Sequence, residues 1–218
     1  MISVLVLCDD YWHPAETIQR GLQGFGQDEF QLDFVMNARD MLSVEMLQDY
    51  PVIMNCKGNQ MTAANRNSWL GDGIAEVGVE ELETYVRNGG GFLSVHSGNS
   101  FTQKDCKSYT DFVGNSFVKH PPRCEIEVVV KKAHPVTKNI HNFVIRDEHY
   151  ELEHIADDAE ILLESISETG GTQVAGYVRT MGNGKICMLS PGHILSVWEN
   201  ESFRQLLKNA LKWCAGKG

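Results

Sequence analysis

The chain has 218 residues, of which 42% are hydrophobic and 22% charged, proportions that are typical of a globular protein and exclude a disordered one. This length suits one sheet with flanking helices, so we expect a single domain over residues 1–218. The formal net charge is −10, and the largest basic cluster is Lys131-Lys132. Because phosphate backbones and anionic lipids would be repelled, we expect neither nucleic acid nor a membrane as a partner.

The six cysteines are scattered, with no pair at CxxC spacing. Cys8, Cys56 and Cys187 lie within apolar runs, where a free thiol packs like a small hydrophobic side chain. We therefore predict cysteines that are neither disulfide-bonded nor catalytic. The N-terminal MISVLVLCDD has no basic segment, and its apolar run is too short for a signal peptide or a membrane span. These features predict a cytoplasmic protein.

The N-terminal half predicts strands and helices in alternation. Helical spacing follows Pro14, recurs over Met41–Leu47, and recurs over Val79–Val86, where a run of Asn and Gly ends the helix. The segment 57–77 is long and polar, and no regular element is predicted there. Continuous apolar runs are typical of parallel strands buried on both faces. They cover Ile2–Leu7, Phe30–Met36, Pro51–Cys56 and Phe92–Val95.

From Arg123 onward the pattern becomes alternating, which indicates antiparallel strands. Asn183-Gly184 is a strong hairpin signal, and the apolar run after it ends at Pro191-Gly192-His193. A helix is predicted over Phe203–Cys214, whose apolar residues share one face. These elements predict an α/β fold: a doubly wound, mostly parallel sheet with antiparallel additions between about Arg123 and Arg179.

Three histidines directly follow predicted strands, namely His13, His96 and His193. In an open parallel sheet, ligands bind outside the carboxyl ends of the strands. A histidine in such a loop is by itself more often a surface or capping residue. Because three of them are predicted to meet at one edge, we treat them as candidate site residues.

His96 stands in GGGFLSVHSG, where small residues flank it as in the tight turn that presents a nucleophile between a strand and a helix. An imidazole at that position suits proton transfer or metal ligation. The alternative is a tight turn with an incidental histidine. Ser97 is a weaker candidate nucleophile, because the pattern GxSxG is absent.

The run Asp147-Glu148-His149-Tyr150 places two carboxylates, an imidazole and a phenol side by side. Glu148 could be a general acid or base if it is buried in the cleft. The alternative is a solvated strand edge that pairs with Arg146. Near the C-terminus, Trp198 offers an aromatic face for a carbohydrate, whereas Asn200 is expected to cap the helix that follows.

The chain resembles the ThuA-like (trehalose utilisation) family over nearly its whole length. The resemblance rests on the first strand with its histidine loop, GGGFLSVHSG, HPVT followed by FVIRDEHYEL, GNGKICMLSPGH, SVWEN and the final FRQLLKNALKWCAG. That family is similar to class I glutamine amidotransferases, which have a flavodoxin-like sheet. His96 takes the place of their elbow cysteine, His193 corresponds to their late histidine, and Leu195 replaces their glutamate, so the resemblance implies a protein that is not a glutaminase.

The resemblance implies a role in disaccharide catabolism, on a sugar that a partner dehydrogenase has oxidised to its 3-keto form. We expect a sugar isomerase, lyase or hydrolase that takes a proton from the carbon beside a carbonyl, and a homo-oligomer is a further expectation. A divalent metal such as zinc is the cofactor that fits this chemistry. The alternatives are a non-catalytic carbohydrate-binding or regulatory module, and a hydrolase that uses Ser97 or a metal-bound water. The expected residues are catalytic His96, Glu148 and His193; substrate-binding Asp9, Trp12, His149, Tyr150 and Trp198; and metal-ligating His13, His149 and His193.

Overall fold

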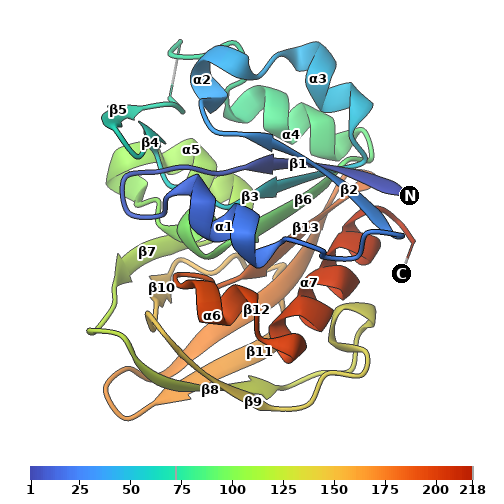
Figure 1. Ribbon diagram of the computed structural model, residues 1–218. Helices are drawn as coiled ribbons and strands as arrows, with labels where there is room; N and C mark the ends of the chain where they lie inside the picture. Colours follow the sequence, from blue (N-terminus) through green and yellow to red (C-terminus); the bar gives the residue numbers. More distant parts are fainter. Residues whose placement is uncertain (72, 218) are drawn as a thin grey trace.

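A computed structural model describes residues 1–71 and 73–217. One nine-stranded sheet runs through it in the order β2-β1-β3-β6-β13-β12-β11-β8-β9 (Figure 1). Its strands are β1 (Ile2–Leu7), β2 (Phe30–Val35), β3 (Val52–Asn55), β6 (Gly91–Val95), β8 (Cys124–Val130), β9 (Phe143–Asp147), β11 (Glu160–Ser167), β12 (Gly171–Met181) and β13 (Gly184–Leu189). The predicted fold class is confirmed, because a parallel sheet carries antiparallel additions.

The first five strands of this order, β2 to β13, are mutually parallel. Every residue of β3 and β6 is buried, as expected for strands covered on both faces. Because these strands are parallel, their carboxyl ends meet at one edge of the sheet. The loops after β1, β6 and β13 therefore lie near one another.

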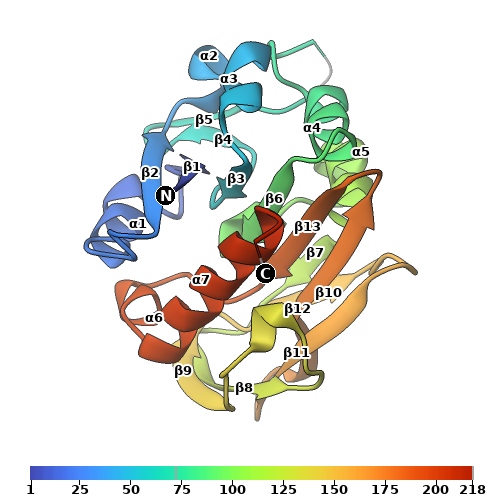
Figure 2. The ribbon, with the colours of Figure 1, turned by 90° about the vertical axis from the view of Figure 1, so that its right-hand side faces the viewer.

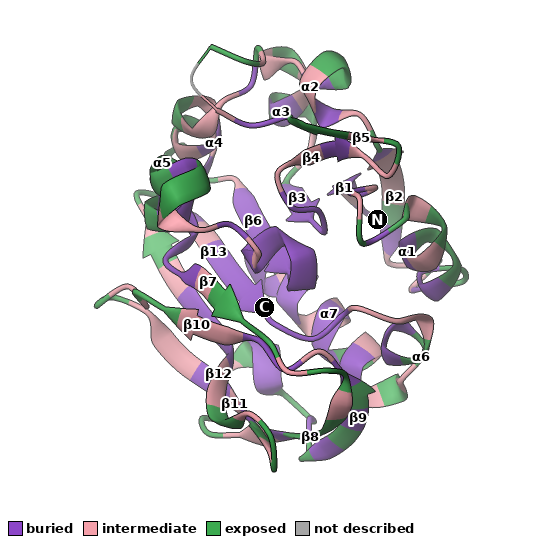
Figure 3. Ribbon diagram, turned by 90° about the vertical axis from the view of Figure 1, so that its left-hand side faces the viewer, coloured by how far each residue is buried: buried purple, intermediate pink, exposed green. Residues whose placement is uncertain are grey.

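The remaining four strands, β12, β11, β8 and β9, pair antiparallel. Buried and exposed residues alternate along β9, so one face of this part of the sheet is open to solvent. Figure 3 shows the contrast: β3, β6 and β13 are almost wholly buried, whereas β9 mixes buried and exposed residues. Two strands outside the main sheet, β7 (Ser116–Lys119) and β10 (Glu151–Glu153), pair with each other.

Helices cover both faces of the parallel part, which gives two separate hydrophobic cores. One core includes residues of α1, α6 and α7, and the other includes residues of α3, α4 and α5 (Figure 2). The helices are α1 (Ala15–Gly21), α2 (Ala38–Met41), α3 (Val44–Asp49), α4 (Val79–Arg87), α5 (Gln103–Val113), α6 (Leu195–Trp198) and α7 (Glu201–Cys214). None of the helices in the described part of the chain is long and apolar enough to cross a bilayer.

The structure differs from the predicted elements in three places. The single helix predicted over Met41–Leu47 is two short helices, because Ser43 has an extended backbone and caps α3 with its hydroxyl. The segment 57–77 contains a small hairpin of β4 (Gln60–Thr62) and β5 (Asn65–Ser68). Helix α5 and strand β7 were not predicted. The cap at Asn200 is confirmed, since its side chain accepts a hydrogen bond from the Phe203 amide at 3.1 Å.

Candidate functional site

His96 lies at the turn from β6 into a short 3-10 helix, η1 (His96–Asn99). Its φ is +43°, a left-handed conformation that costs a residue with a side chain about 1–3 kcal/mol. The turn is tight, because a Cβ on Gly98 would lie 2.4 Å from the Asn55 carbonyl oxygen. His96 is buried, and its Nδ1 lies 2.8 Å from the Ser190 carbonyl oxygen. Its Nε2 is buried, and no hydrogen bond reaches it from the residues that the structure describes.

His13 lies in the loop after β1 and is held by the buried carboxylate of Asp10. The His13 Nδ1 is 2.8 Å from Asp10 Oδ1 and 3.1 Å from Oδ2. The same Oδ1 accepts hydrogen bonds from the backbone amides of Trp12 and His13. Asp10 therefore fixes both the loop backbone and the orientation of the imidazole ring.

His193 follows β13 and is placed by a second buried carboxylate, Asp147 at the end of β9. Asp147 accepts hydrogen bonds from the backbone amides of Gly192 at 2.7 Å and of His193 at 3.1 Å. The His193 Nδ1 lies 2.9 Å from His13 Nε2. The loop after the last parallel strand is thus tied to the antiparallel part of the sheet.

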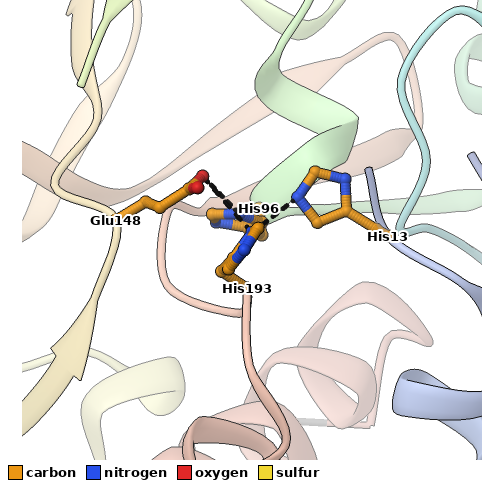
Figure 4. Close-up of side chains that lie close together, drawn as sticks. All are labelled: His13, His96, Glu148 and His193. Carbon is orange, nitrogen blue, oxygen red and sulfur yellow. Dashed lines mark hydrogen bonds and ion pairs between the residues drawn. The ribbon is translucent and has the colours of Figure 1, made fainter. Parts of the chain in front are cut away.

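Glu148 comes from the antiparallel part, between β9 and β10. Its Oε2 lies 3.3 Å from His193 Nδ1 and 3.5 Å from His96 Nε2. It also lies 3.5 Å from Nε2 of His120, which follows β7. Figure 4 shows His13, His96, Glu148 and His193 turned toward a common centre. One side-chain atom from each of these four residues lies within 4.8 Å of the others, so the cluster could hold a metal ion.

The charged groups of the cluster shift the pKa values of one another. Burial lowers the pKa of His96, but the facing carboxylates of Glu148 and Asp147 outweigh it, so the pKa is raised overall. Burial opposes the charge of Glu148 too, yet the three histidines around it lower its pKa to about 2. The pKa of His193 falls to about 4, because of burial and the neighbouring His96. The two histidines therefore shift in opposite directions, His96 toward its charged form and His193 toward its neutral form.

A pocket of about 420 Å³ opens beside the cluster. This volume lies within the range of small-molecule sites, about 300–1,000 Å³. Tyr150 lies on one side, with its ring centroid 4.4 Å from that of His96, and Trp12 stands at the pocket with 67% of its surface exposed. The pocket is lined by Asp10, Trp12, His13, Gln60, Ser97, Ser100, Phe117, His120, Glu148, Tyr150 and His193.

The structure does not bring three of the expected site residues to this pocket. The His149 ring points toward β11, with Nδ1 2.6 Å from Ser167 Oγ and Nε2 2.9 Å from Ser165 Oγ. It lies outside the cluster because alternate residues of an extended segment face opposite ways. We correct its assignment as a metal ligand accordingly.

Trp198 and Asp9 also have structural contacts in place of the expected ones. The Trp198 indole is 1% exposed, and its Nε1 donates a hydrogen bond to the Gly192 carbonyl at 2.7 Å. Asp9 accepts hydrogen bonds from the amides of Ala15 at 3.0 Å and Ala63 at 3.1 Å, so it joins the start of α1 to the β4–β5 hairpin. Trp198 thus supports the loop of His193 from behind.

Residues missed from the sequence include Asp10, Phe117 and His120, which line the pocket, and the buried Lys57, which does not. Asp10 stands out there only as part of a polar loop, although a carboxylate three residues before a histidine is within reach of its ring. His120 and Phe117 escaped notice because β7 was not predicted. Lys57, which is fully buried, donates hydrogen bonds to the carbonyls of Met36 and Met61, both at 2.6 Å. Burial lowers the pKa of Lys57 to about 8, against the opposing effect of Asp10.

Ser97, the alternative nucleophile, donates its hydroxyl proton to Asp10 Oδ2. The same oxygen accepts a hydrogen bond from the Gly58 amide at 2.8 Å. A serine nucleophile needs a base such as histidine on its hydroxyl. In the described part of the chain Ser97 has a carboxylate partner, and so the observed contact favours a role in holding Asp10.

The fold defines an α/β protein of the class I glutamine amidotransferase-like, flavodoxin-like class, with a histidine at the elbow of β6. Residues 3–214 match the model of the ThuA family, which is described as trehalose utilisation. The chain belongs to the ThuA family, and a role related to trehalose utilisation follows from this membership. No curated protein matches the sequence.

Solved structures share the fold at low sequence identity. A ThuA-like protein from Bacteroides uniformis is 21% identical, with a TM-score of 0.73 over 98% of this chain and 91% of that one. A ThuA-like protein from Parabacteroides merdae is 17% identical, with a TM-score of 0.70 over 99% and 90%. A GMP synthase protein from Thermoplasma acidophilum is 15% identical, with a TM-score of 0.59 over 99% and 95%.

Proposed function

We propose that the protein is a sugar-processing enzyme of disaccharide catabolism, which acts on a 3-keto-glycoside by acid/base chemistry. The observation that carries this proposal is the convergence of three histidines and Glu148 beside a pocket of about 420 Å³. Three of these groups, His96, Glu148 and His193, have perturbed pKa values, and such groups beside a pocket are typical of catalytic sites. Family membership supplies the class of substrate.

In the proposed reaction, Glu148 takes the proton from the carbon beside the keto group, and an enediolate develops on the sugar. Its ionised carboxylate lines the pocket and is 13% exposed, so a bound substrate can reach it. His96 and His193 are the proposed catalytic histidines facing the same centre. A divalent metal such as zinc, when bound by histidines of the cluster, would stabilise the negative charge that develops on the oxygen.

Trp12 and Tyr150 are the proposed substrate contacts. The exposed Trp12 ring offers an apolar face to a pyranose, and burial keeps the pKa of Tyr150 well above its ordinary value, so its hydroxyl stays a neutral donor. The elbow carries an imidazole and no thiol, so the proposal does not include glutaminase chemistry. We further propose a single cytoplasmic domain that receives its substrate from a sugar dehydrogenase, and that self-associates.

The proposal is tested by incubating the purified protein with 3-keto-trehalose and with trehalose and following each sugar by NMR. We expect the keto sugar to be converted, with loss of turnover in His96→Ala. Exchange of the proton beside the carbonyl with deuterated solvent reports the first step directly. If the wild-type protein leaves the keto sugar unchanged and exchanges no proton, the enzyme proposal is wrong.

The second candidate is a non-catalytic carbohydrate-binding or regulatory module. The observation that favours it is the histidine at the elbow, where an amidotransferase-like protein would need a thiol. Such a module would bind the sugar with no chemical change. Calorimetric titration that finds tight sugar binding, together with NMR that finds no turnover, would favour this candidate.

A further inference from the structure

We infer that His13 Nε2, His96 Nε2 and His193 Nδ1 are the three protein ligands of one divalent cation of the zinc class, and that Glu148 stands beside it as the acid/base group. The inference deepens the metal part of the proposed function and rests on it, but it does not depend on which sugar is bound. It replaces the expected ligand His149 with His96.

The hydrogen bonds of two histidines fix which ring nitrogen carries the proton. His13 Nδ1 faces the Asp10 carboxylate at 2.8 Å, and His96 Nδ1 faces the Ser190 carbonyl at 2.8 Å. A carboxylate and a carbonyl oxygen are acceptors, so each Nδ1 must be the donor. In the neutral imidazole this leaves a lone pair on each Nε2, which is the form that binds metals in proteins.

His96 Nε2 is the atom that most needs a partner. It is buried, the ring is 2% exposed, and among the described residues its contact is the Glu148 carboxylate at 3.5 Å, with no hydrogen bond made. Buried polar atoms without a partner are rare, because they lose their bonds to water without replacement. The Nε2 faces the same centre as His13 and His193 (Figure 4). A cation at that centre would bind His96 Nε2 and would replace the hydrogen bond that now joins His13 Nε2 to His193 Nδ1.

The observed spacing suits a tetrahedral metal. Zinc binds histidine nitrogen at about 2.0–2.1 Å, so two nitrogens on a tetrahedral zinc lie about 3.3 Å apart. His13 Nε2 and His193 Nδ1 are 2.9 Å apart, and no two candidate ligand atoms are separated by more than 4.8 Å. Imidazole ligands select zinc and its transition-metal neighbours over calcium and magnesium, which prefer oxygen.

Asp10 is the positioning residue of this site. Both of its oxygens contact His13 Nδ1, and Oδ2 also accepts hydrogen bonds from Gly58 and Ser97, so the carboxylate cannot rotate freely. Metal-bound histidines usually have such a carboxylate behind them, and its loss costs about 10–100-fold in metal affinity. A charged carboxylate behind the ring also offsets the charge of the cation.

Glu148 is assigned a different role because of its place. It is the one member of the cluster that comes from the antiparallel part, and its Oε2 also faces His120 at 3.5 Å. Three protein ligands with a further position open to the pocket are typical of catalytic zinc sites, whereas four close the site. Since the pocket opens beside the cluster, we assign the three nitrogens as ligands.

The test is metal binding by the whole purified protein, stripped with chelator and titrated with zinc against a chromophoric chelator, with bound metal counted by mass spectrometry. We expect one zinc per chain. His96→Ala should weaken binding by at least about 100-fold, and Asp10→Asn by about 10–100-fold. Glu148→Gln should change the affinity by less than about 3-fold while turnover is lost.

Two histidines outside the cluster serve as matched controls. His141→Ala removes an exposed histidine and His149→Ala a buried one, and neither should change zinc affinity. Circular dichroism shows whether each variant is folded. If His96→Ala does not fold, the zinc affinity of Asp10→Asn tests the site independently.

Less than one zinc per chain for the stripped and reloaded protein would overturn the inference. Loss of zinc in His149→Ala, or in Glu148→Gln, would overturn the ligand assignment. Zinc binding without sugar turnover would contradict the proposed function and leave the metal site standing. Sugar turnover by a protein that binds no zinc would overturn the metal site and leave the proposed function standing.

Discussion

The parallel and antiparallel parts of the sheet contribute differently to the candidate site. The parallel part, β2 to β13, is covered by helices on both faces, and its loops after β1, β6 and β13 carry the three histidines. The antiparallel part has one open face and supplies Glu148 and Tyr150, while β7 supplies Phe117 and His120. The buried parallel part therefore places the histidine nitrogens. The more exposed antiparallel part, together with β7, places the Glu148 carboxylate and the aromatic side chains of the pocket.

The two parts are joined by the β12–β13 pairing and, at the site, by hydrogen bonds to the buried carboxylate of Asp147. Asp147, at the end of β9, holds the amides of Gly192 and His193 after β13. These bonds join the loop of His193 directly to the end of the strand that precedes Glu148. Catalytic groups need placement within a fraction of an ångström, so we interpret Asp147 as the connection that keeps the two contributions in register.

The largest expected effect is on turnover, and it separates the two contributions. His193→Ala should lower turnover of the keto sugar by at least about 1,000-fold and also release zinc, because it removes a nitrogen from the parallel part. Glu148→Gln should lower turnover by about 100–10,000-fold, the usual contribution of a general base, and retain zinc. Parallel assays of turnover and bound metal measure both. Equal metal loss in the two variants would abolish the distinction.

The next largest effect is on the free energy of unfolding. It compares the packing of the parallel part of the sheet with that of the antiparallel part. Leu93→Ala in β6 should lower the free energy of unfolding by about 2–5 kcal/mol, because Leu93 is fully buried and leaves a cavity. Val144→Ala in β9 should cost less than about 0.5 kcal/mol, since Val144 is 54% exposed. Urea unfolding measures both. Similar losses would show that the two parts are equally packed.

Much of the fold could be predicted from the sequence, and the reasons are local. Buried parallel strands such as Ile2–Leu7 are continuous apolar runs, and the hairpin at Asn183-Gly184 has its own turn chemistry. The edge position of His13, His96 and His193 follows from topology. The β7–β10 pair could not be predicted, because each strand is short and its partner is distant in sequence.

The direction of individual side chains was the harder problem. Glu148 and His149 are neighbours in one extended segment, yet only Glu148 faces the cluster, and nothing local decides which. Trp198 is a large aromatic residue at the end of the short helix α6, and it packs against Gly192 and Phe203, which the sequence does not place beside it. Asp10 contacts His13 in its own loop, but its other partners, Gly58 and Ser97, come from distant parts of the sequence.

A smaller effect tests the new placement of His149. His149→Ala should lower the free energy of unfolding by about 1–3 kcal/mol, because the ring is buried and contacts Ser165 and Ser167. Turnover should stay within about 2-fold of the wild-type value, since the ring lies outside the cluster. Thermal unfolding and the keto-sugar assay measure the two. A large loss of turnover without destabilisation would return His149 to the site.

The smallest expected effect is from cysteine modification. Of the six free cysteines, Cys124 alone is not fully buried, and burial raises the pKa of thiols such as Cys56 and Cys187 well above the ordinary value. Brief treatment with an alkylating reagent should leave turnover unchanged. Rapid stoichiometric inactivation, with one modified cysteine found by mass spectrometry, would point to a thiol in the mechanism.

The central claim is that loops from three parallel strands place three nitrogens around one cation. It is tested most directly by anomalous diffraction at the zinc edge from crystals of the zinc-loaded protein. We predict a single strong peak at about 2.0–2.1 Å from His13 Nε2, His96 Nε2 and His193 Nδ1, with the Asp10 carboxylate still bonded to His13. An empty cluster, or a peak elsewhere in the molecule, would contradict the claim.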